Sequence, residues 1–410
     1  MDMQSNVGIE YDLAKVKNDI KNILNNPSKD DIEKDQEYVY KQWIHNDKVY
    51  NIIKYNKNVI EFKEENGLFR SIIFSNGEIN VFSPPKSIKF NEFVSRYQLN
   101  ECYGEEIIEG TMVNVFYDKT ADLWTMATKT SVGGKLRYFQ DQENFDILFE
   151  QVCSAVELDL NNLDKQYTYS FVMQHPNNRF VLPINQMRLY LIAIYKIDDV
   201  VVREIPREKY NDLNLDDVFK KLWFPYRFYI DSYENLYNNF GSMNCDINYV
   251  GVMIKTITGV RSKIVNPAYK YIKDLRGNHS KLQFQYLSLR RDDRVKEYLK
   301  FYPEASKKFN EFRKHLHLFT NNLYQNYVSC YIKHEKPLME FSPKFRTHMY
   351  NLHQHYLSIK EDKGYIHKYS VIEYVNKLEP SLLMYSLNYD LRELGKKYAE
   401  QSVMMQPNKN

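Results

Sequence analysis

Residues 105–134 carry the residue types with which this chain could do chemistry. Two apolar runs flank a polar turn, and the first run opens at Glu109-Gly110 while the second ends at Lys129. This layout is typical of a strand pair that cradles a nucleotide, and such a pair usually carries a lysine three places ahead of the glycine. Ile107 occupies that place. The sequence therefore raises the question of whether the chain can still carry out a reaction at this strand pair or keeps only its fold.

The runs around this stretch predict the elements that position it. From about residue 36 to 275, short runs of β-branched and aromatic residues alternate with turn signals, which is typical of strands. The runs are KVYNIIKY, LFRSIIFSNGEINVFS, GTMVNVFYD, LWTMATK, YTYSFVMQ, RLYLIAIYKI and YVGVMIKTITGVRSKIV. Asn76-Gly77 predicts a hairpin because both residues tolerate positive φ, and NFDILFEQVCSAV predicts a helix. This mixture predicts an α+β domain over residues 36–278.

The pattern becomes helical after about residue 280. Apolar residues recur at steps of three and four, at Phe309, Phe312, Leu316, Phe319, Leu323 and Tyr327. Ser342-Pro343 predicts the start of a second amphipathic helix, and a third helical segment around residues 371–378 ends before Pro380. We expect an all-helical domain over residues 279–410, in which the aromatic stripe is core. Residues 1–35 are polar, and we expect a leader with one short helix.

Length and composition narrow the class of protein. A chain of 410 residues should fold as two or three domains, and 43% hydrophobic with 27% charged residues is ordinary for a soluble globular protein. The net charge of +3 is too small to indicate nucleic-acid binding unless basic residues are segregated. No apolar run reaches about 18 residues, and the N-terminus lacks a signal-peptide core. We expect a cytoplasmic protein without membrane contact, and the cysteine spacing predicts no metal site.

Four segments resemble, in order and spacing, the first RNA ligase family of the T-even phages, within the covalent nucleotidyltransferase superfamily. They are FRSIIFSNGEINVFSPPKSIKFNEF, EIIEGTMVNVFYD with LWTMATKTSV, YTYSFVMQHPNNRFVLPINQMRLYLIAIYKI, and VGVMIKTITGVRSKIVNPAY. The resemblance covers about residues 65 to 275 and implies an antiparallel-sheet nucleotidyltransferase domain followed by a helical C-terminal domain. The chain is also similar to ligase-like proteins of large DNA viruses, which implies a viral protein in the host cytoplasm.

In that family, a lysine amine attacks the α-phosphate of ATP, and the AMP then passes to an RNA 5′-phosphate before a 3′-hydroxyl displaces it. Nearby cations lower the pKa of the lysine, and a metal ion offsets the phosphate charge. The resemblance places Ile107 at the nucleophile, Ser170 at the ribose-binding glutamate and Val250 at the metal-site glutamate. Because isoleucine has no lone pair, the resemblance implies a catalytically silent relative.

Other positions of the family pattern are kept. The resemblance implies nucleotide- or phosphate-binding roles for six residues, Arg70, Glu109, Gly110, Lys129, Arg179 and Lys263. A second phosphate-binding lysine falls on Val265, and Asn178 keeps the family pattern within a turn signal. Structural roles for the same residues stay open. Lys129 and Lys263 could be solvated lysines at strand edges, Arg70 and Arg179 could form structural ion pairs, and Glu109 could be a carboxylate at a sheet edge.

We therefore expect a catalytically inactive RNA-ligase-like protein that binds RNA or a protein partner through the former substrate cleft and the helical domain, without a cofactor. Basic clusters in the helical part, RRDDRVK, KKFNEFRKH and KFRTH, suit either RNA contacts or solvated helix faces. The alternative is an ATP-dependent RNA ligase, using ATP and Mg, with its nucleophile relocated to Lys63 or Lys129. A weaker alternative is a structural viral component.

Overall fold

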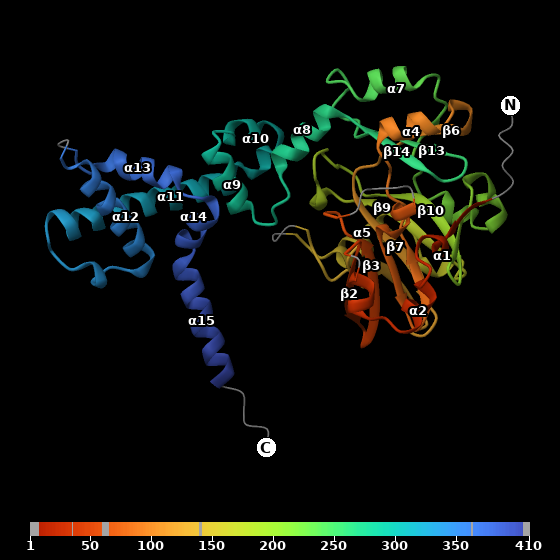
Figure 1. Ribbon diagram of the computed structural model, residues 1–410, viewed down its shortest axis with the longest axis horizontal. Coiled ribbons are helices and arrows are strands. Elements are labelled where there is room, and N and C mark those ends of the chain that lie inside the picture. The colour runs from red at the N-terminus through yellow and green to blue at the C-terminus, as the bar shows by residue number, and fades with distance from the viewer. Residues whose placement is uncertain (1–7, 35, 60–64, 139–141, 362–363, 405–410) are drawn as a thin grey trace. The chain divides into compact units, whose positions relative to one another are not determined.

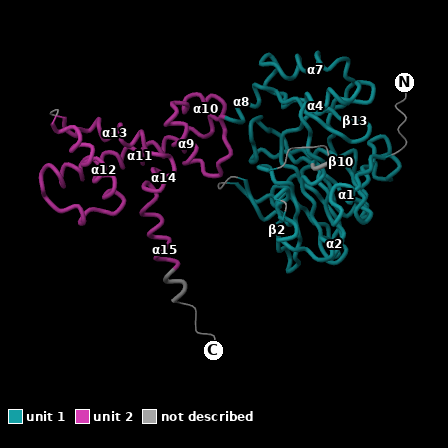
Figure 2. The backbone as a smooth tube through the Cα atoms, viewed as in Figure 1, with its two compact units in different colours: residues 1–274 teal, residues 275–410 magenta. Residues whose placement is uncertain are grey.

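The chain divides into two compact units, Met1–Asp274 and Leu275–Asn410 (Figure 2). The structure is a computed structural model that describes residues 8–34, 36–59, 65–138, 142–361 and 364–404. Unit 1 holds the strands and unit 2 is helical (Figure 1). The expected α+β class, antiparallel sheets followed by a helical C-terminal region, is confirmed.

Three antiparallel sheets form the frame of unit 1. Sheet A has the order β1 (Ile9–Asp12), β11 (Val201–Glu204), β10 (Arg188–Asp198), β9 (Tyr167–Gln174), β7 (Thr111–Asp118) and β8 (Leu123–Ala127). Sheet B has the order β2 (Tyr38–His45), β3 (Lys48–Tyr55), β4 (Ile72–Ser75) and β5 (Glu78–Phe82). Sheet C has the order β12 (Arg227–Phe228), β6 (Cys102–Glu106), β13 (Gly251–Thr256) and β14 (Arg261–Val265).

The hairpin predicted at Asn76-Gly77 is confirmed. Strands β4 and β5 meet there, with φ of +52° at Asn76 and +79° at Gly77. Two positive φ values in a two-residue loop give the twist that neighbouring antiparallel strands need. This hairpin therefore sets the register of sheet B from local chemistry.

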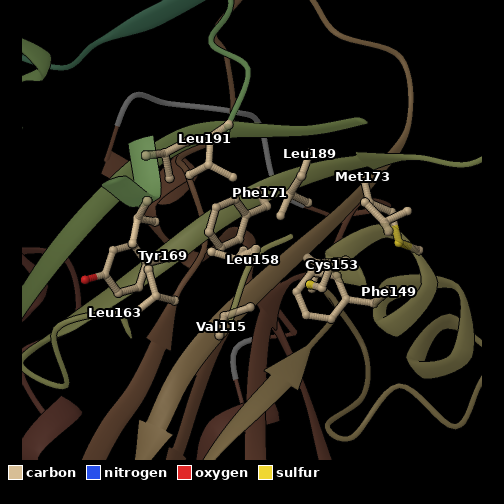
Figure 3. Close-up of a cluster of buried hydrophobic side chains, with 14 of the residues drawn as sticks. Val115, Phe149, Cys153, Leu158, Leu163, Tyr169, Phe171, Met173, Leu189 and Leu191 are labelled. Carbon is tan, nitrogen blue, oxygen red and sulfur yellow. The ribbon is translucent and has the colours of Figure 1, made fainter. Parts of the chain in front are cut away.

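One core of unit 1 lies between sheet A and helix α5 (Phe145–Ala155), the helix that the sequence predicts among the strands. Figure 3 shows Phe149 and Cys153 of α5 beside Val115 of β7, Met173 of β9 and Leu189 of β10. Burial of such side chains is worth about 1.5–3 kcal/mol each. Sheet A is therefore held rigidly from one face.

The described part of residues 1–35, the segment expected to be a leader, pairs and packs within unit 1. Strand β1 pairs with β11, and the short helices α1 (Leu13–Val16), α2 (Ile20–Asn25) and α3 (Lys29–Glu33) follow it. Apolar side chains of these helices are buried with residues of sheets A and B, namely Leu13, Ile20, Ile23, Leu24 and Ile32. The polar composition concealed these few apolar positions because short helices give too few turns to show a period.

Helices account for the regular structure of unit 2. They are α9 (Leu282–Arg291), α10 (Val295–Phe301), α11 (Ser306–Tyr327), α12 (Pro343–Ile359), α13 (Lys368–Lys377), α14 (Pro380–Leu387) and α15 (Tyr389–Met404). The stripe predicted on α11 is largely buried, at Phe309, Leu316, Phe319, Leu323 and Tyr327. Among the described residues, no helix combines the length and apolar character needed to cross a membrane.

Candidate functional site

The loop that joins β6 of sheet C to β7 of sheet A holds the position expected for the nucleophile. Ile107 is half-buried there, and its N–H donates to the Gly251 carbonyl at 3.3 Å. Val250, which precedes that glycine, is 8% exposed. The backbone therefore brings together the two positions where the resemblance implies a lysine and a glutamate, and both carry hydrocarbon side chains.

The carboxylate of Glu109 is hydrogen-bonded by backbone groups of the protein. Its oxygens accept hydrogen bonds from the backbone N–H groups of Phe180, Val181 and Leu182 at 2.7–3.2 Å, and the residue is 5% exposed. A buried carboxylate with several amide donors is a strong anchor. Glu109 therefore fixes the loop that follows Asn178, which donates to Thr111 at 2.6 Å.

Gly110 and Arg179 belong to the same anchor. Gly110 has φ of +152°, and a Cβ there would lie 2.4 Å from the Met173 carbonyl oxygen, so the close approach of β7 to β9 requires glycine. Arg179 donates from Nε to the Val181 carbonyl at 3.0 Å. Both residues thus take part in holding the loop in place.

Ser170 lies in the interior of sheet A, fully buried. Its hydroxyl donates to Asn114 Oδ1 at 2.7 Å, and Asn114 Nδ2 donates to Ser83 Oγ at 3.1 Å. This chain of three side chains joins β9, β7 and the end of β5. The hydroxyl at the expected ribose-binding position is therefore satisfied within the protein.

Four cations converge from separate parts of unit 1, and we name Arg70, Lys86, Lys129 and Lys263 the cation cluster. The segment of residues 84–88 joins them. Arg70 Nη1 donates to the Pro84 carbonyl at 3.2 Å, and Lys86 N–H donates to the Gly67 carbonyl at 2.9 Å.

Two further contacts complete the cluster's frame. Ile88 N–H donates to the Arg261 carbonyl at 2.9 Å, which ties the segment to β14 and so to Lys263. Ser71 Oγ donates to the Lys129 carbonyl at 3.0 Å, which ties the loop after β8 to the residue after Arg70. Two backbone hydrogen bonds and two side-chain-to-backbone hydrogen bonds therefore join the segments that carry the cluster.

Lys129 has a strongly lowered pKa and a contact with an aromatic ring. Burial, followed by the positive charges of Arg70, Lys57, Lys54 and Lys86, lowers its pKa to about 8. Its Nζ lies 4.8 Å from the centroid of the Tyr55 ring. Within the described residues, no carboxylate lies within 4.0 Å of this amine. The amine therefore remains mostly charged at pH 7 without a carboxylate partner among the described residues, and burial together with the neighbouring cations destabilises that charge.

Lys263 behaves in the same way, although its side chain keeps an exposed surface. Partial burial, and then the charges of Lys86, Lys273 and Arg70, lower its pKa to about 8. The pKa of Arg70 is lowered by burial and by Arg261, and that of Lys86 by burial and by Arg70 and Lys57. Burial is the largest cause of each shift, and the mutual repulsion of the cations adds to it in the same direction.

The sequence-predicted site residues thus fall into two groups. Arg70, Lys129 and Lys263 meet in the cation cluster, whereas Glu109, Gly110 and Arg179 hold the loop of residues 178–182. Sequence reasoning missed Lys86, and also Lys54 and Lys57 near the end of β3, because isolated lysines carry no signal before the sheets are assembled. Lys63, considered as a relocated nucleophile, lies outside the described residues.

The cation cluster offers positively charged side chains, which attract anions and repel metal ions. Among the described residues, no group of three His, Cys, Asp or Glu side chains is arranged to hold a metal. Mg²⁺ requires oxygen ligands, and the expected glutamate positions carry Ser170 and Val250. We therefore assign no step to a metal.

The basic clusters of unit 2 are partly used within the protein. Arg291 pairs with Glu379 at 2.7 Å, and Arg294 pairs with Glu297 at 2.8 Å. Lys344 pairs with Asp390 at 2.6 Å. These pairs neutralise part of the charge that the sequence suggested for RNA contacts.

Comparison with known proteins adds one viral relative. The chain is 24% identical over 204 residues to the immediate-early protein ICP-46 homolog of Invertebrate iridescent virus 3. The match covers 47% of this chain and 41% of that protein, so the chain spans less than half the length of this relative. No family model matches the chain.

Solved structures similar to the chain include RNA and DNA ligases. An archaeal ATP-dependent RNA ligase matches with a TM-score of 0.38 and 12% identity, covering 70% of this chain and 78% of that chain. A putative ATP-dependent DNA ligase from Aquifex aeolicus matches with a TM-score of 0.36 and 12% identity, covering 73% and 78%. A mutant of the Naegleria gruberi RNA ligase with AMP and Mn matches with a TM-score of 0.34 and 12% identity, covering 46% and 57%.

Proposed function

We propose that this chain is a catalytically inactive protein of the nucleotidyltransferase fold that binds RNA through the cation cluster. The convergence of Arg70, Lys86, Lys129 and Lys263 carries the proposal. Concentrating like charges costs free energy in the free protein, and a bound polyanion removes that cost. RNA phosphates supply closely spaced anions, and their release of counterions drives binding.

The absence of an amine at Ile107 supports the inactive part of the proposal. A covalent nucleotidyl intermediate needs a lone pair in line with the leaving pyrophosphate, and an isoleucine side chain offers none. Val250 and Ser170 also replace carboxylates that the resemblance assigns to the metal and the ribose. A cleft that binds phosphates without this constellation is expected to hold RNA and leave it unchanged.

Salt-dependent RNA binding tests the proposal. We expect the double variant Lys129→Met/Lys263→Met to bind a single-stranded RNA at least about tenfold more weakly than wild type. Its slope of log affinity against log salt should be shallower by about 1.4, at about 0.7 for each lost phosphate contact on a single strand. The matched control is Lys119→Met, whose side chain is 77% exposed and pairs with Glu78.

Fluorescence anisotropy between 50 and 300 mM salt gives both quantities. No binding of RNA by wild type at low salt would eliminate the RNA proposal and leave a protein partner as the ligand of the cluster. Equal salt slopes for wild type and the double variant would also contradict it, because the cluster would then contribute no phosphate contact.

One observation favours a second function, an ATP-dependent RNA ligase with a relocated nucleophile. Because the pKa of Lys129 is lowered to about 8, about a tenth of this amine is neutral at pH 7. Incubation with labelled ATP and Mg²⁺, followed by a denaturing gel, tests it. We expect no label on the protein. A label that disappears in Lys129→Met but not in Lys119→Met would establish the ligase function, and one that disappears only in a Lys63 variant would move the nucleophile there.

A further inference from the structure

Residues 223–229 expose an aromatic ring at every third position. Trp223 is 47% exposed, Tyr226 is 69% exposed and Tyr229 is 77% exposed. Large aromatic side chains are usually buried because their transfer from water is favourable. Three such rings therefore lie exposed on one short segment, where a ligand can reach them.

The segment is held rigidly between two sheets. Trp223 N–H donates to the Leu189 carbonyl at 2.9 Å, and Leu191 N–H donates to the Trp223 carbonyl at 2.8 Å, so this end is attached to β10 of sheet A. Glu106 N–H donates to the Tyr226 carbonyl at 2.9 Å, so the middle is attached to β6 of sheet C. The backbone at Trp223 and Tyr226 is thus fixed before any ligand arrives, which lowers the entropy cost of binding.

Guanidinium groups lie beside these rings. The Arg188 guanidinium lies 4.5 Å from the centroid of the Trp223 ring, and that of Arg207 lies 4.5 Å from the centroid of the Phe224 ring. Arg207 also donates to the Pro225 carbonyl at 2.9 Å, which fixes its plane. Flat cations beside aromatic faces are the combination that binds bases and phosphates of a single strand.

A cavity of about 500 Å³ opens next to the central ring. It is lined by Arg207, Glu208, Phe224, Pro225, Tyr226 and Arg227, so one carboxylate stands among the aromatic and guanidinium groups. Arg227 is held in place by Glu105 at 3.0 Å and by Glu208 at 2.9 Å. The cavity therefore offers two aromatic surfaces and two oriented guanidinium groups, and its volume suits one flat base with its sugar.

We infer that residues 223–229 form a base-stacking platform for unpaired bases of single-stranded RNA. The inference rests on the proposed function and deepens it, because it separates the contacts to bases from the contacts to phosphates. Its position supports this division. The Tyr226 backbone pairs with Glu106, the residue directly before Ile107. Strand β12, which follows Tyr226, lies three strands from the β14 strand that carries Lys263.

The separation across sheet C matches a short RNA. Three strand spacings of about 4.8 Å make about 14 Å, which about four stacked nucleotides span at 3.4 Å each. The Lys263 side chain shares one face of sheet C with Arg227, whereas Tyr226 stacks on Phe228 of the other face, so an RNA that reaches both must pass around the edge strand β12. A protein ligand would use the exposed rings equally well, but it would not need the neighbouring concentration of positive charge.

The test separates bases from phosphates with three probes, a 12-nucleotide single-stranded RNA, the same RNA with abasic central positions, and inorganic polyphosphate. Binding of each is measured by competition in fluorescence anisotropy. We expect Tyr226→Ala and Tyr229→Ala to weaken binding of the intact RNA by about five- to a hundredfold, without weakening binding of the abasic RNA or of polyphosphate. Tyr226→Phe keeps the ring and should bind like wild type.

The two proposals fail in different ways. If wild type binds neither RNA nor polyphosphate, the proposed function fails and the platform inference fails with it. If Lys129→Met/Lys263→Met weakens all three probes while the tyrosine variants bind intact RNA like wild type, only the platform is refuted. Equal losses for intact and abasic RNA would also refute it. Tyr229 is largely exposed, so Tyr229→Ala should fold even if Tyr226→Ala does not, and circular dichroism checks both.

Discussion

Replacing Lys129 by methionine should stabilise the free protein while weakening its affinity for RNA. The fall of its pKa from 10.5 to about 8, at about 1.36 kcal/mol per unit, sets an upper limit of about 3.4 kcal/mol for the cost of the charge. The amine is partly exposed and lies over the Tyr55 ring, so solvent screening and the lost ring contact reduce this. We expect the free energy of unfolding to rise by about 1–2 kcal/mol at pH 7.

The sign of the pH dependence follows from linkage. The folded-state pKa is below the unfolded one, so the unfolded chain binds the proton more tightly. The destabilisation is therefore complete below pH 8 and disappears as the pH rises to 10.5. The variant's advantage should accordingly shrink between those values. Urea unfolding at pH 7 and pH 10 measures this difference in the free energy of unfolding. The proteins compared are wild type, Lys129→Met and the exposed control Lys119→Met.

The reasoning is refuted if Lys129→Met destabilises the protein equally at both pH values, because the lysine would then be an ordinary packing residue. It is also refuted if the variant is more stable at pH 7 but binds RNA with unchanged affinity. In that case the Lys129 charge would destabilise the free protein without contributing to RNA binding. Lys119→Met should change neither quantity, since its side chain is 77% exposed.

Three further predictions concern the same region. The RNA affinity of wild type should fall between pH 7 and 9, because Lys129 and Lys263, each with a pKa of about 8, lose their protons there. Fluorescence anisotropy at constant salt measures this fall, and Lys129→Met/Lys263→Met should show a flatter pH profile. Glu109→Ala should lower the free energy of unfolding, measured in urea, by about 2–4 kcal/mol, because three backbone N–H groups lose their acceptor. An effect below about 0.5 kcal/mol would show that water replaces the carboxylate as the acceptor. Ile107→Lys alone should produce no labelled AMP adduct with ATP and Mg²⁺, since Ser170 and Val250 still lack carboxylates; a stable adduct would show that the pocket has kept the rest of its chemistry.

The sequence by itself determined the elements whose signals are local. KVYNIIKY and YTYSFVMQ coincide with β3 and β9, and the Asn76-Gly77 turn lies between β4 and β5. Strand alternation and turn chemistry depend on neighbours along the chain, so they can be read without the fold. The residue type at Ile107 is likewise visible in the sequence, and it removes the amine whatever the fold.

Only the tertiary structure decided which charges meet. Lys86 is one lysine among many until residues 84–88 pair with β14 and contact the turn before Arg70. The Glu109 carboxylate could have faced a ligand, but the loop of residues 180–182 brings three amides to it. Such convergences depend on how three sheets are ordered and packed. That order is set by long-range burial, which no window of sequence contains.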